Sequence, residues 1–384
     1  MSEHNNIKEI ARLFLKLGFT AFGGPAGHTA MMWEEVVVKR NWLSEQQFLD
    51  LMGATNLIPG PNSTELAIHI GKEKGGWKGM LVAGSLFILP AVLITGIFAY
   101  LYKIYGQLPQ VEPFVYGIKP AIIAIILAAV YPLGKQSVKS KELAIVGLLV
   151  LIFSFFVQNE ILLMFGFGLL FMLYKSLKEK HTLNSFFPIP FLSIPLMTTI
   201  SVTNLKLFWI FLKIGAVLYG SGYVLFAFLD SELVTTGILS RQELIDAIAV
   251  GQFTPGPVTS SVTFIGYQIN GIWGAIISTF AVFLPSFIFV ALLNPILKFL
   301  RKSTRFSSFL DAVNIASVAL IISVCIIMGR EVITDWRTIS IAIISLFLTF
   351  GFRKISSVVI ILLGSFDGLF ITSNIIKILF YDTL

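Results

Sequence analysis

Charged side chains are scarce in this sequence. Asp, Glu, Lys and Arg make up 13% of the 384 residues, about half the share of roughly 25% that is usual in soluble domains. So few charges cannot cover a water-exposed surface, and the composition therefore excludes an ordinary soluble domain. Hydrophobic residues make up 56% of the chain, and the mean hydropathy is +0.85. These values predict an all-α polytopic membrane protein whose surroundings are a lipid bilayer.

Residues that bind metals or form disulfides are equally rare. The single cysteine, Cys325, excludes a disulfide within the chain. The sequence has no P-loop, no His-Glu-x-x-His pair and no haem-attachment motif. The four histidines are too scattered to form a metal site: His4, His28, His69 and His181. We therefore expect no enzyme and no bound metal or cofactor.

The net charge of +7 raises the question of nucleic-acid binding. The basic residues, however, lie in short loops between apolar runs, as the positive-inside rule describes for membrane proteins. We therefore expect no nucleic-acid partner. The first apolar stretch carries Lys8, Arg12 and Lys16, which is unlike a cleavable signal peptide. Several apolar runs reach or approach the ~20 residues that span a bilayer, namely 80–101, 121–133, 143–157, 161–173, 272–297 and 339–352.

One short motif, Pro-Gly-Pro, occurs twice, at 59–61 and at 255–257, and apolar, helix-like sequence flanks both copies. Proline is unfavourable inside a helix but favoured at its first position, and glycine permits a sharp turn of the backbone. Each motif is therefore predicted to end one helix and begin another, with Pro61 and Pro257 near the first turn. A helix break of this kind inside a membrane is typical of a substrate site.

The Pro-Gly-Pro pair is part of a repeat that extends over the whole chain. Residues 14–18 match 211–215, and residues 89–90 match 284–285, with a separation of 195 to 197 residues. Two halves of about equal size therefore share one design. We predict a first repeat, a linker and a second repeat at 1–180, 181–204 and 205–384.

The basic residues predict that the two repeats have opposite orientations. Lys72, Lys74 and Lys78 precede the first long apolar run, whereas the matching loop at 267–273 has no Lys or Arg. A reversed charge bias indicates inverted-topology repeats. Inversion requires the linker at 181–204 to cross the membrane, and a loop lying on the membrane surface is the alternative. Each repeat is expected to contain two broken, re-entrant helix pairs followed by four spans.

The predicted helix breaks lie near Pro25, Pro61, Gly222 and Pro257. Each helix N-terminus can aim backbone N–H groups and a partial positive charge at an anion. Hydroxyl and amide side chains gather at these breaks, which suits an oxyanion that must be bound and released. Helix capping and ordinary helix–helix hydrogen bonds are the alternative. The predicted binding residues are Gly23, Gly24, Pro25, Asn56, Gly60, Asn62, Ser63, Thr64, Gly222, Thr254, Gly256, Thr259 and Ser260.

Three ionisable residues near the breaks are candidates for proton coupling. Glu65 follows the first Pro-Gly-Pro, His69 lies four residues later on the same helical face, and His28 follows the Gly-Gly-Pro break. An ionisable side chain at membrane depth is costly and usually functional, and histidine titrates near neutral pH. A structural pairing of Glu65 with His69 is the alternative.

Other charged residues recur at matched positions of the two repeats. The recurrence of the acidic residues favours a role in the fold, whereas the lysines could neutralise a bound anion or extend to the membrane interface. The matched residues are Lys16 with Lys213, Glu35 with Glu232, and Asp50 with Asp246.

Four segments together resemble the chromate ion transporter family in its long, two-domain form. They are Phe22-Gly23-Gly24-Pro25-Ala26-Gly27-His28, Pro59-Gly60-Pro61-Asn62-Ser63-Thr64-Glu65, Gly220-Ser221-Gly222-Tyr223-Val224 and Thr254-Pro255-Gly256-Pro257-Val258. The resemblance covers nearly the whole chain. It implies a secondary transporter that exports chromate across the bacterial cytoplasmic membrane, is driven by an ion gradient and gives chromate resistance. Sulfate, a dianion of the same shape, is an implied competitor. One departure is Ser221, where the family more often has glycine.

Several alternatives stay open at the level of sequence. The cargo could be sulfate or another oxyanion, carried in either direction, because chromate and sulfate share charge and shape. Broken helices also line anion channels. A homodimer is a further possibility for the assembly.

Overall fold

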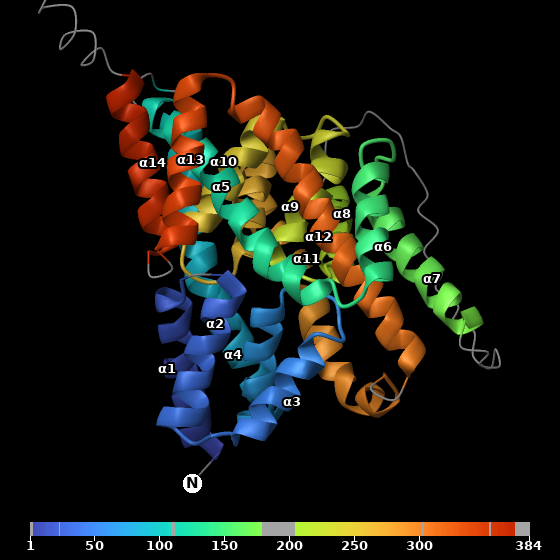
Figure 1. The fold of residues 1–384 in the computed structure, drawn as a ribbon. Helices are drawn as coiled ribbons and strands as arrows, with labels where there is room; N and C mark the ends of the chain where they lie inside the picture. Colours follow the sequence, from blue (N-terminus) through green and yellow to red (C-terminus); the bar gives the residue numbers. More distant parts are fainter. Residues whose placement is uncertain are drawn as a thin grey trace, which may run out of the picture.

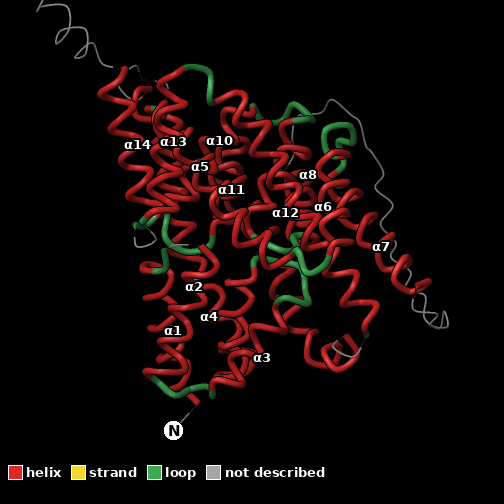
Figure 2. The backbone as a smooth tube through the Cα atoms, viewed as in Figure 1, coloured by secondary structure: helices red, strands yellow, loops and turns green. Residues whose placement is uncertain are grey.

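The computed structural model describes residues 3–22, 24–106, 108, 112–178, 204–300, 303–352 and 355–372. All regular secondary structure in these ranges is helical, joined by short loops (Figures 1 and 2). Five of the described helices are long and apolar enough to cross a membrane. The predicted all-α, multi-pass membrane fold is therefore confirmed. Residues 181–203 of the predicted linker lie outside the described residues, so its crossing of the membrane stays a prediction.

The helices of the two halves correspond, except that α2 and α4 of the first half each match a short 3-10 helix followed by an α-helix in the second half. The first half comprises α1 (Glu3–Thr20), α2 (Gly24–Trp33), η1 (Glu34–Lys39), α3 (Glu45–Thr55), α4 (Asn62–Tyr105), α5 (Glu112–Ser137), α6 (Lys141–Phe153) and α7 (Glu160–Lys178). The second comprises α8 (Asn204–Val217), η2 (Gly222–Val224), α9 (Leu225–Leu229), η3 (Asp230–Val234), α10 (Arg241–Phe253), η4 (Val258–Ser260), α11 (Ser261–Leu300), α12 (Thr304–Val332), α13 (Trp336–Gly351) and α14 (Ser357–Thr372).

Helices α4 and α11 each fold back on themselves at a sharp kink. The kinks lie at Gly75-Gly76 and at Asn270-Gly271, where Gly76 and Gly271 both have a φ of 60°. Glycine adopts this left-handed conformation without steric cost. Each helix is therefore a hairpin of a short arm and a long arm. The short arms are 62–74 and 261–269, and the long arms are 77–105 and 272–300.

Contacts between the hairpins fix the relative direction of the two repeats. The Thr95 hydroxyl of the first long arm lies 3.4 Å from the Ser260 hydroxyl, and the Ala99 carbonyl accepts a 2.9 Å hydrogen bond from Gln268. The second short arm thus runs parallel to the first long arm. Its own long arm turns back, so the two long arms run in opposite directions. Figure 1 agrees, because α1 begins at the lower end of the molecule and α8 at the upper end. The repeats are inverted, as the charge bias predicted.

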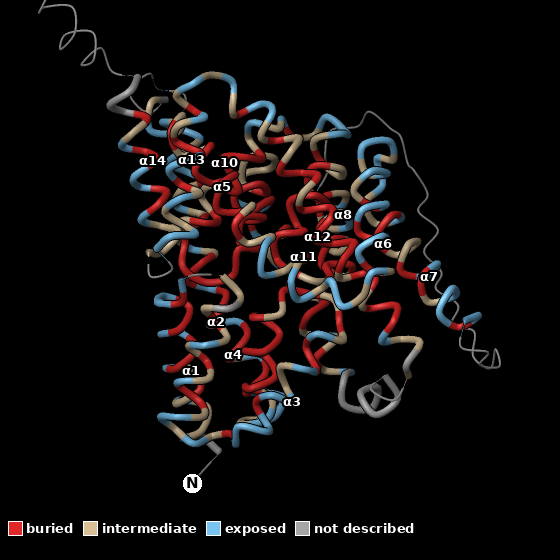
Figure 3. The backbone as a smooth tube through the Cα atoms, viewed as in Figure 1, coloured by how far each residue is buried: buried red, intermediate tan, exposed pale blue. Residues whose placement is uncertain are grey.

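The remaining helices form a second bundle in which the repeats are interleaved. Helix α5 packs against α12, α13 and α14, and α12 packs against α5, α6 and α7. The interior of this bundle is apolar, whereas many large apolar side chains, such as Ile145, Leu170 and Phe347, are exposed on its outer faces. Figure 3 shows the buried backbone in the middle of the molecule and the exposed backbone around it. An apolar exterior of this extent suits contact with lipid.

Candidate functional site

The two Pro-Gly-Pro turns have the backbone geometry that their sequence predicts. Pro61 and Pro257 stand directly before Asn62 and Val258, the first residues of α4 and η4. Gly60 and Gly256 have φ values of 141° and 90°, which lie in the region that favours glycine. The helical N–H groups after each proline therefore point out of a helix end in the interior of the protein.

The two turns interlock across the repeat boundary. The N–H of Gly60 donates to the Leu218 carbonyl at 2.7 Å, and the N–H of Gly256 donates to the Ala21 carbonyl at 2.8 Å. Ala21 and Leu218 occupy matched positions after α1 and α8. Each repeat thus donates the equivalent hydrogen bond to the other, as expected for two repeats related by a two-fold axis. It brings the two Pro-Gly-Pro turns to one place.

All four predicted helix breaks contribute to a small recess at this place, named here the first recess. Its walls come from both repeats, and its volume of about 10 Å³ leaves room for roughly one water molecule. In this closed form the recess is too small for a tetrahedral oxyanion. It is lined by Pro25, His28, Pro61, Asn62, Ser63, Gly222, Tyr223, Pro257, Val258 and Thr259.

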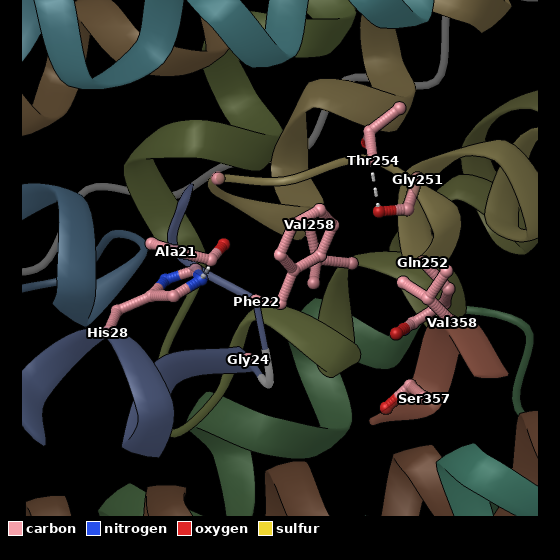
Figure 4. Close-up of a pocket in the computed structure, with 11 residues that line it drawn as sticks. Ala21, Phe22, Gly24, His28, Gly251, Gln252, Thr254, Val258, Ser357 and Val358 are labelled. Carbon is pink, nitrogen blue, oxygen red and sulfur yellow. Dashed lines mark hydrogen bonds between the residues drawn. The ribbon is translucent and has the colours of Figure 1, made fainter. Parts of the chain in front are cut away.

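A second recess adjoins the first and shares His28 and Val258 with it. Figure 4 shows how the imidazole of His28 and the backbone of Ala21 face Val258, with Gln252 and Ser357 further along. Ser357 belongs to α14, so the interleaved bundle also reaches this site. No Asp, Glu, Lys or Arg is among the described residues that line either recess. The lining of the second recess is Ala21, Phe22, Gly24, His28, Gly251, Gln252, Thr254, Gly256, Val258, Ser357 and Val358.

Hydrogen-bonding groups in the two recesses are only partly satisfied. His28 is 1% exposed, and its ring nitrogens lie 3.1 Å from the Ser63 hydroxyl and 3.2 Å from the Ala21 carbonyl. The Thr259 hydroxyl and the Gln252 amide nitrogen are buried and have no hydrogen-bond partner in the described part of the chain. A buried polar group without a partner is costly unless a ligand or water satisfies it. These groups therefore point to a ligand.

The structure brings most of the predicted binding residues together, but not all of them. The residues that line a recess are Gly24, Pro25, Asn62, Ser63, Gly222, Thr254, Gly256 and Thr259. Asn56, Gly60, Thr64 and Ser260 do not line either recess, and Gly23 lies outside the described residues.

The helical rotation of roughly 100° per residue explains two of these differences. Ser63 and Thr259 face the first recess, so their neighbours Thr64 and Ser260 face elsewhere. The Ser260 hydroxyl lies near Thr95 instead. Asn56 accepts a 2.9 Å hydrogen bond from the amide of Asn62 and so orients a residue that does line the recess.

Of the three proton-coupling candidates, only His28 lines the recesses. Glu65 is fully buried, and both of its carboxyl oxygens lack a hydrogen-bond partner within the described residues. Nε2 of His69 is also without one, so the alternative, a structural pairing of Glu65 with His69, does not form. The Glu65 carboxyl instead lies against Gly60 and the Ser286 hydroxyl.

The matched lysines are bound to the matched glutamates. Lys16 lies 2.9 Å from Glu35, and Lys213 lies 2.5 Å from Glu232. Their cationic heads are thus engaged in ion pairs, and neither lysine is among the described residues that line the recesses. Asp50 and Asp246 differ, because Asp50 is exposed whereas Asp246 is buried.

The lining also includes Tyr223, Gln252 and Ser357, which are not among the predicted binding residues. Gln252 lies three residues before the second Pro-Gly-Pro, and Tyr223 follows the Gly220 turn, so proximity to the motifs was a usable signal for both. Ser357 starts the last helix, and nothing in its neighbourhood indicates a site.

Comparison with known proteins shows the family of this chain. The family model described as "Chromate transporter" matches residues 8–172 and 205–369. The "Probable chromate transport protein" of Synechococcus elongatus is 30% identical over 390 residues, covering 96% of each chain. The "Chromate transport protein" of Cupriavidus metallidurans is 29% identical over 372 residues, covering 94% of this chain and 92% of the relative.

A third relative, an uncharacterized transporter of Methanocaldococcus jannaschii, is 28% identical over 387 residues, covering 95% of this chain and 94% of its own. No solved structure matches the chain. The family model covers most of the sequence in two copies, and the full-length relatives agree with it. The chain belongs to the chromate transporter family.

Proposed function

We propose that this protein is a secondary active transporter that exports chromate across the bacterial cytoplasmic membrane and thereby gives chromate resistance. One observation carries the proposal. Ser63 and Thr259 come from opposite repeats, follow the two Pro-Gly-Pro turns at matched positions, and line the same recess. The family and the names of the relatives support chromate as the cargo.

The chemistry of the recess suits a dianion that must be released again. The N-termini of α4 and η4 supply backbone N–H groups and partial positive charge. Ser63, Thr259 and Asn62 supply neutral side-chain donors. A fixed lysine or arginine would hold a dianion more tightly, and the described lining of the recess contains neither. The binding residues of the proposal are those predicted residues that line a recess.

The membrane potential supports the outward direction. Moving one elementary charge down a potential difference of 100 mV releases about 2.3 kcal/mol of free energy. A dianion that leaves an inside-negative cell therefore releases about 4.6 kcal/mol per 100 mV. Inverted repeats can expose one central site to each side in turn. Proton coupling is part of the proposal, with Glu65, His69 and His28 as its candidates.

Sulfate or another tetrahedral oxyanion is the alternative cargo, because the recess has no feature that separates dianions of one shape. An anion channel is less well supported. The bonds from Gly60 to Leu218 and from Gly256 to Ala21 cross the centre of the protein, and the recess between the turns holds roughly one water. A channel requires a continuous path, whereas an occluded centre suits alternating access.

The direct test is uptake of labelled chromate and of labelled sulfate into everted membrane vesicles, with and without a pH gradient. Export in cells corresponds to uptake into these vesicles. We expect saturable chromate uptake that depends on the protein and that excess sulfate reduces. Uptake no greater than in vesicles without the protein would refute the proposal. Single-channel currents in planar bilayers would establish the channel instead.

A further inference from the structure

Each repeat places one hydroxyl group at the first recess, at matched positions, and the two hydroxyls differ in their hydrogen bonding. Ser63 and Thr259 are each the second residue after their Pro-Gly-Pro motif. The Ser63 hydroxyl is 3.1 Å from Nδ1 of His28, whereas the Thr259 hydroxyl has no hydrogen-bond partner among the described residues. The position that matches His28 in the second repeat is held by Leu225. The asymmetry therefore comes from His28 alone.

The surroundings of His28 fix which ring nitrogen carries the proton. A carbonyl oxygen only accepts hydrogen bonds, so Nε2, which faces the Ala21 carbonyl at 3.2 Å, must carry a hydrogen. In the neutral ring Nδ1 is then an acceptor. The Ser63 hydroxyl has one hydrogen, and it must donate that hydrogen to Nδ1. Figure 4 shows the ring directed at Ala21.

The ring is held in this orientation from two sides. The Ala21 carbonyl also accepts the N–H of Gly256, so it is fixed by the second Pro-Gly-Pro turn. The Phe87 ring packs edge-on to the imidazole with 5.6 Å between the centroids. A 180° flip of the ring would put carbon atoms in the places of Nδ1 and Nε2, and would lose the contacts with both Ser63 and Ala21. The hydrogen-bond direction at Ser63 therefore depends on the protonation of His28.

In the neutral state, Ser63 can present only oxygen lone pairs to the first recess, which repel an oxyanion. Protonation of Nδ1 reverses the bond: Nδ1–H donates to the Ser63 oxygen, and the serine hydrogen is released to point into the recess. The imidazolium adds a positive charge beside the same recess. Protonation of one ring thus creates both a donor and a charge for an anion.

We propose that His28 takes one proton from water when the oxyanion enters the first recess, so that Ser63 becomes a donor to the anion and the dianion binds together with one proton. This inference rests on the proposed function. Thr259 donates to the anion irrespective of pH. The bound pair carries a net charge of −1, so an inside-negative potential still drives it outward, with about half the force on the bare dianion.

Among the described residues that line the recesses, no other basic group competes with His28 for this role. The elements that line the recesses with His28 are the turn after α1, the short arm of α4, η2, α10, the second Pro-Gly-Pro turn and α14, and Phe87 of the long arm packs on the ring. Tyr223 is the other titratable residue in this described lining. A phenol with an ordinary pKa of about 10 stays neutral at physiological pH. Glu65 and His69 lie further along α4 and line neither recess. Within the described lining, His28 is therefore the one basic group that can accept the proton that binds with the anion.

The test is the number of protons taken up as chromate binds to the purified full-length protein. Titration calorimetry in buffers of different ionisation enthalpy gives this number, at a mildly alkaline pH where free chromate is the dianion. We expect the wild type to take up about one proton per anion. His28→Gln keeps a polar side chain that does not ionise. It should take up almost none and bind chromate roughly tenfold to a hundredfold more weakly, as for loss of a charge-assisted hydrogen bond.

Two further variants separate the possible outcomes. Thr259→Ala should bind more weakly but keep the proton uptake, because its hydroxyl is not bonded to a titratable group. Glu65→Gln, which removes the rival proton carrier, should also keep it. Three results would overturn the inference. They are proton uptake that persists in His28→Gln, loss of proton uptake in Glu65→Gln, and a wild type that binds chromate without taking up a proton. Wild-type protein that binds no chromate refutes the proposed function itself.

Discussion

The carboxyl group of Glu65 occupies the space that a side chain on Gly60 would need. A Cβ added to Gly60 would overlap Oε1 of Glu65 and lie 2.7 Å from the Ser286 hydroxyl. Gly60 belongs to the first Pro-Gly-Pro and Ser286 to the long arm of α11. The glycine is therefore required both by its φ of 141° and by the close approach of the other repeat.

The substitution Gly60→Ala should accordingly destabilise the protein and abolish transport. Left-handed backbone and overpacking each cost on the order of 1–3 kcal/mol, and here they act together. Gly53→Ala is the matched control, because Gly53 is helical and a Cβ there would meet nothing within 4 Å. The thermal unfolding midpoint in detergent measures both. A Gly60→Ala protein as stable and active as Gly53→Ala would contradict the close packing.

Neighbouring hydroxyls after the second Pro-Gly-Pro should differ in their effect on transport. Thr259 lines the first recess and has no hydrogen-bond partner in the described structure, whereas Ser260 points to Thr95. Thr259→Ala removes a donor to the anion, and a hydrogen bond to a charged group is worth about 1.5–3 kcal/mol, or roughly tenfold or more in affinity. Ser260→Ala should leave the affinity within a factor of about two.

The concentration dependence of chromate uptake into everted vesicles measures this difference. Protein levels in the membrane must be matched, because either variant could alter expression. Equal losses for Thr259→Ala and Ser260→Ala would show that the recess is not the binding site.

Much of the fold follows from the sequence because its signals are local or periodic. The Pro-Gly-Pro turns, the two-fold repeat and its inversion rest on proline chemistry, on matched spacing and on loop charge. The site was harder to predict. Ser63 and Thr64 are equally polar, and only the helical rotation after Pro61 decides that Ser63 faces the recess. Ser357 reaches the site through the packing of α14, which no local pattern encodes.

The ion pairs of Glu35 with Lys16 and Arg40 predict a dependence of stability on pH. Burial alone would raise the pKa of Glu35, but hydrogen bonds and charges from Lys16 and Arg40 outweigh it and lower the pKa to about 2 from the ordinary 4.5. A lowered pKa means that Glu35 contributes its stabilisation above pH 4.5, and that this contribution is lost as the pH falls from 4.5 toward 2.

Glu35→Gln should therefore be less stable than the wild type at neutral pH, and the difference should shrink on acidification through this range. Unfolding midpoints across the pH series give the comparison. Glu34→Gln is a suitable control, because its one ion pair, with Lys39 at 3.5 Å, joins two half-exposed side chains and should contribute little. A constant difference between Glu35→Gln and the wild type at all pH values would contradict the role of the ion pairs.

The buried carboxylate of Asp246 joins helices of both repeats and gives the last prediction. It accepts a 2.6 Å hydrogen bond from Tyr102 of α4 and lies 3.2 Å from the ammonium group of Lys119 in α5. Lys119→Met would leave this carboxylate without its cation, and breaking a buried pair typically costs about 3–5 kcal/mol. Because α10 leads into the second Pro-Gly-Pro, the loss should reduce transport as well as stability.

The double variant Lys119→Met with Asp246→Asn removes both charges and should recover much of the lost stability. The coupling energy from this double-mutant cycle measures the pair directly. Asp50→Asn, at the matched but exposed position of the first repeat, should change stability far less. If the two single losses simply add in the double variant, Lys119 and Asp246 are independent, and the docking of α10 on α5 must rest on its apolar contacts.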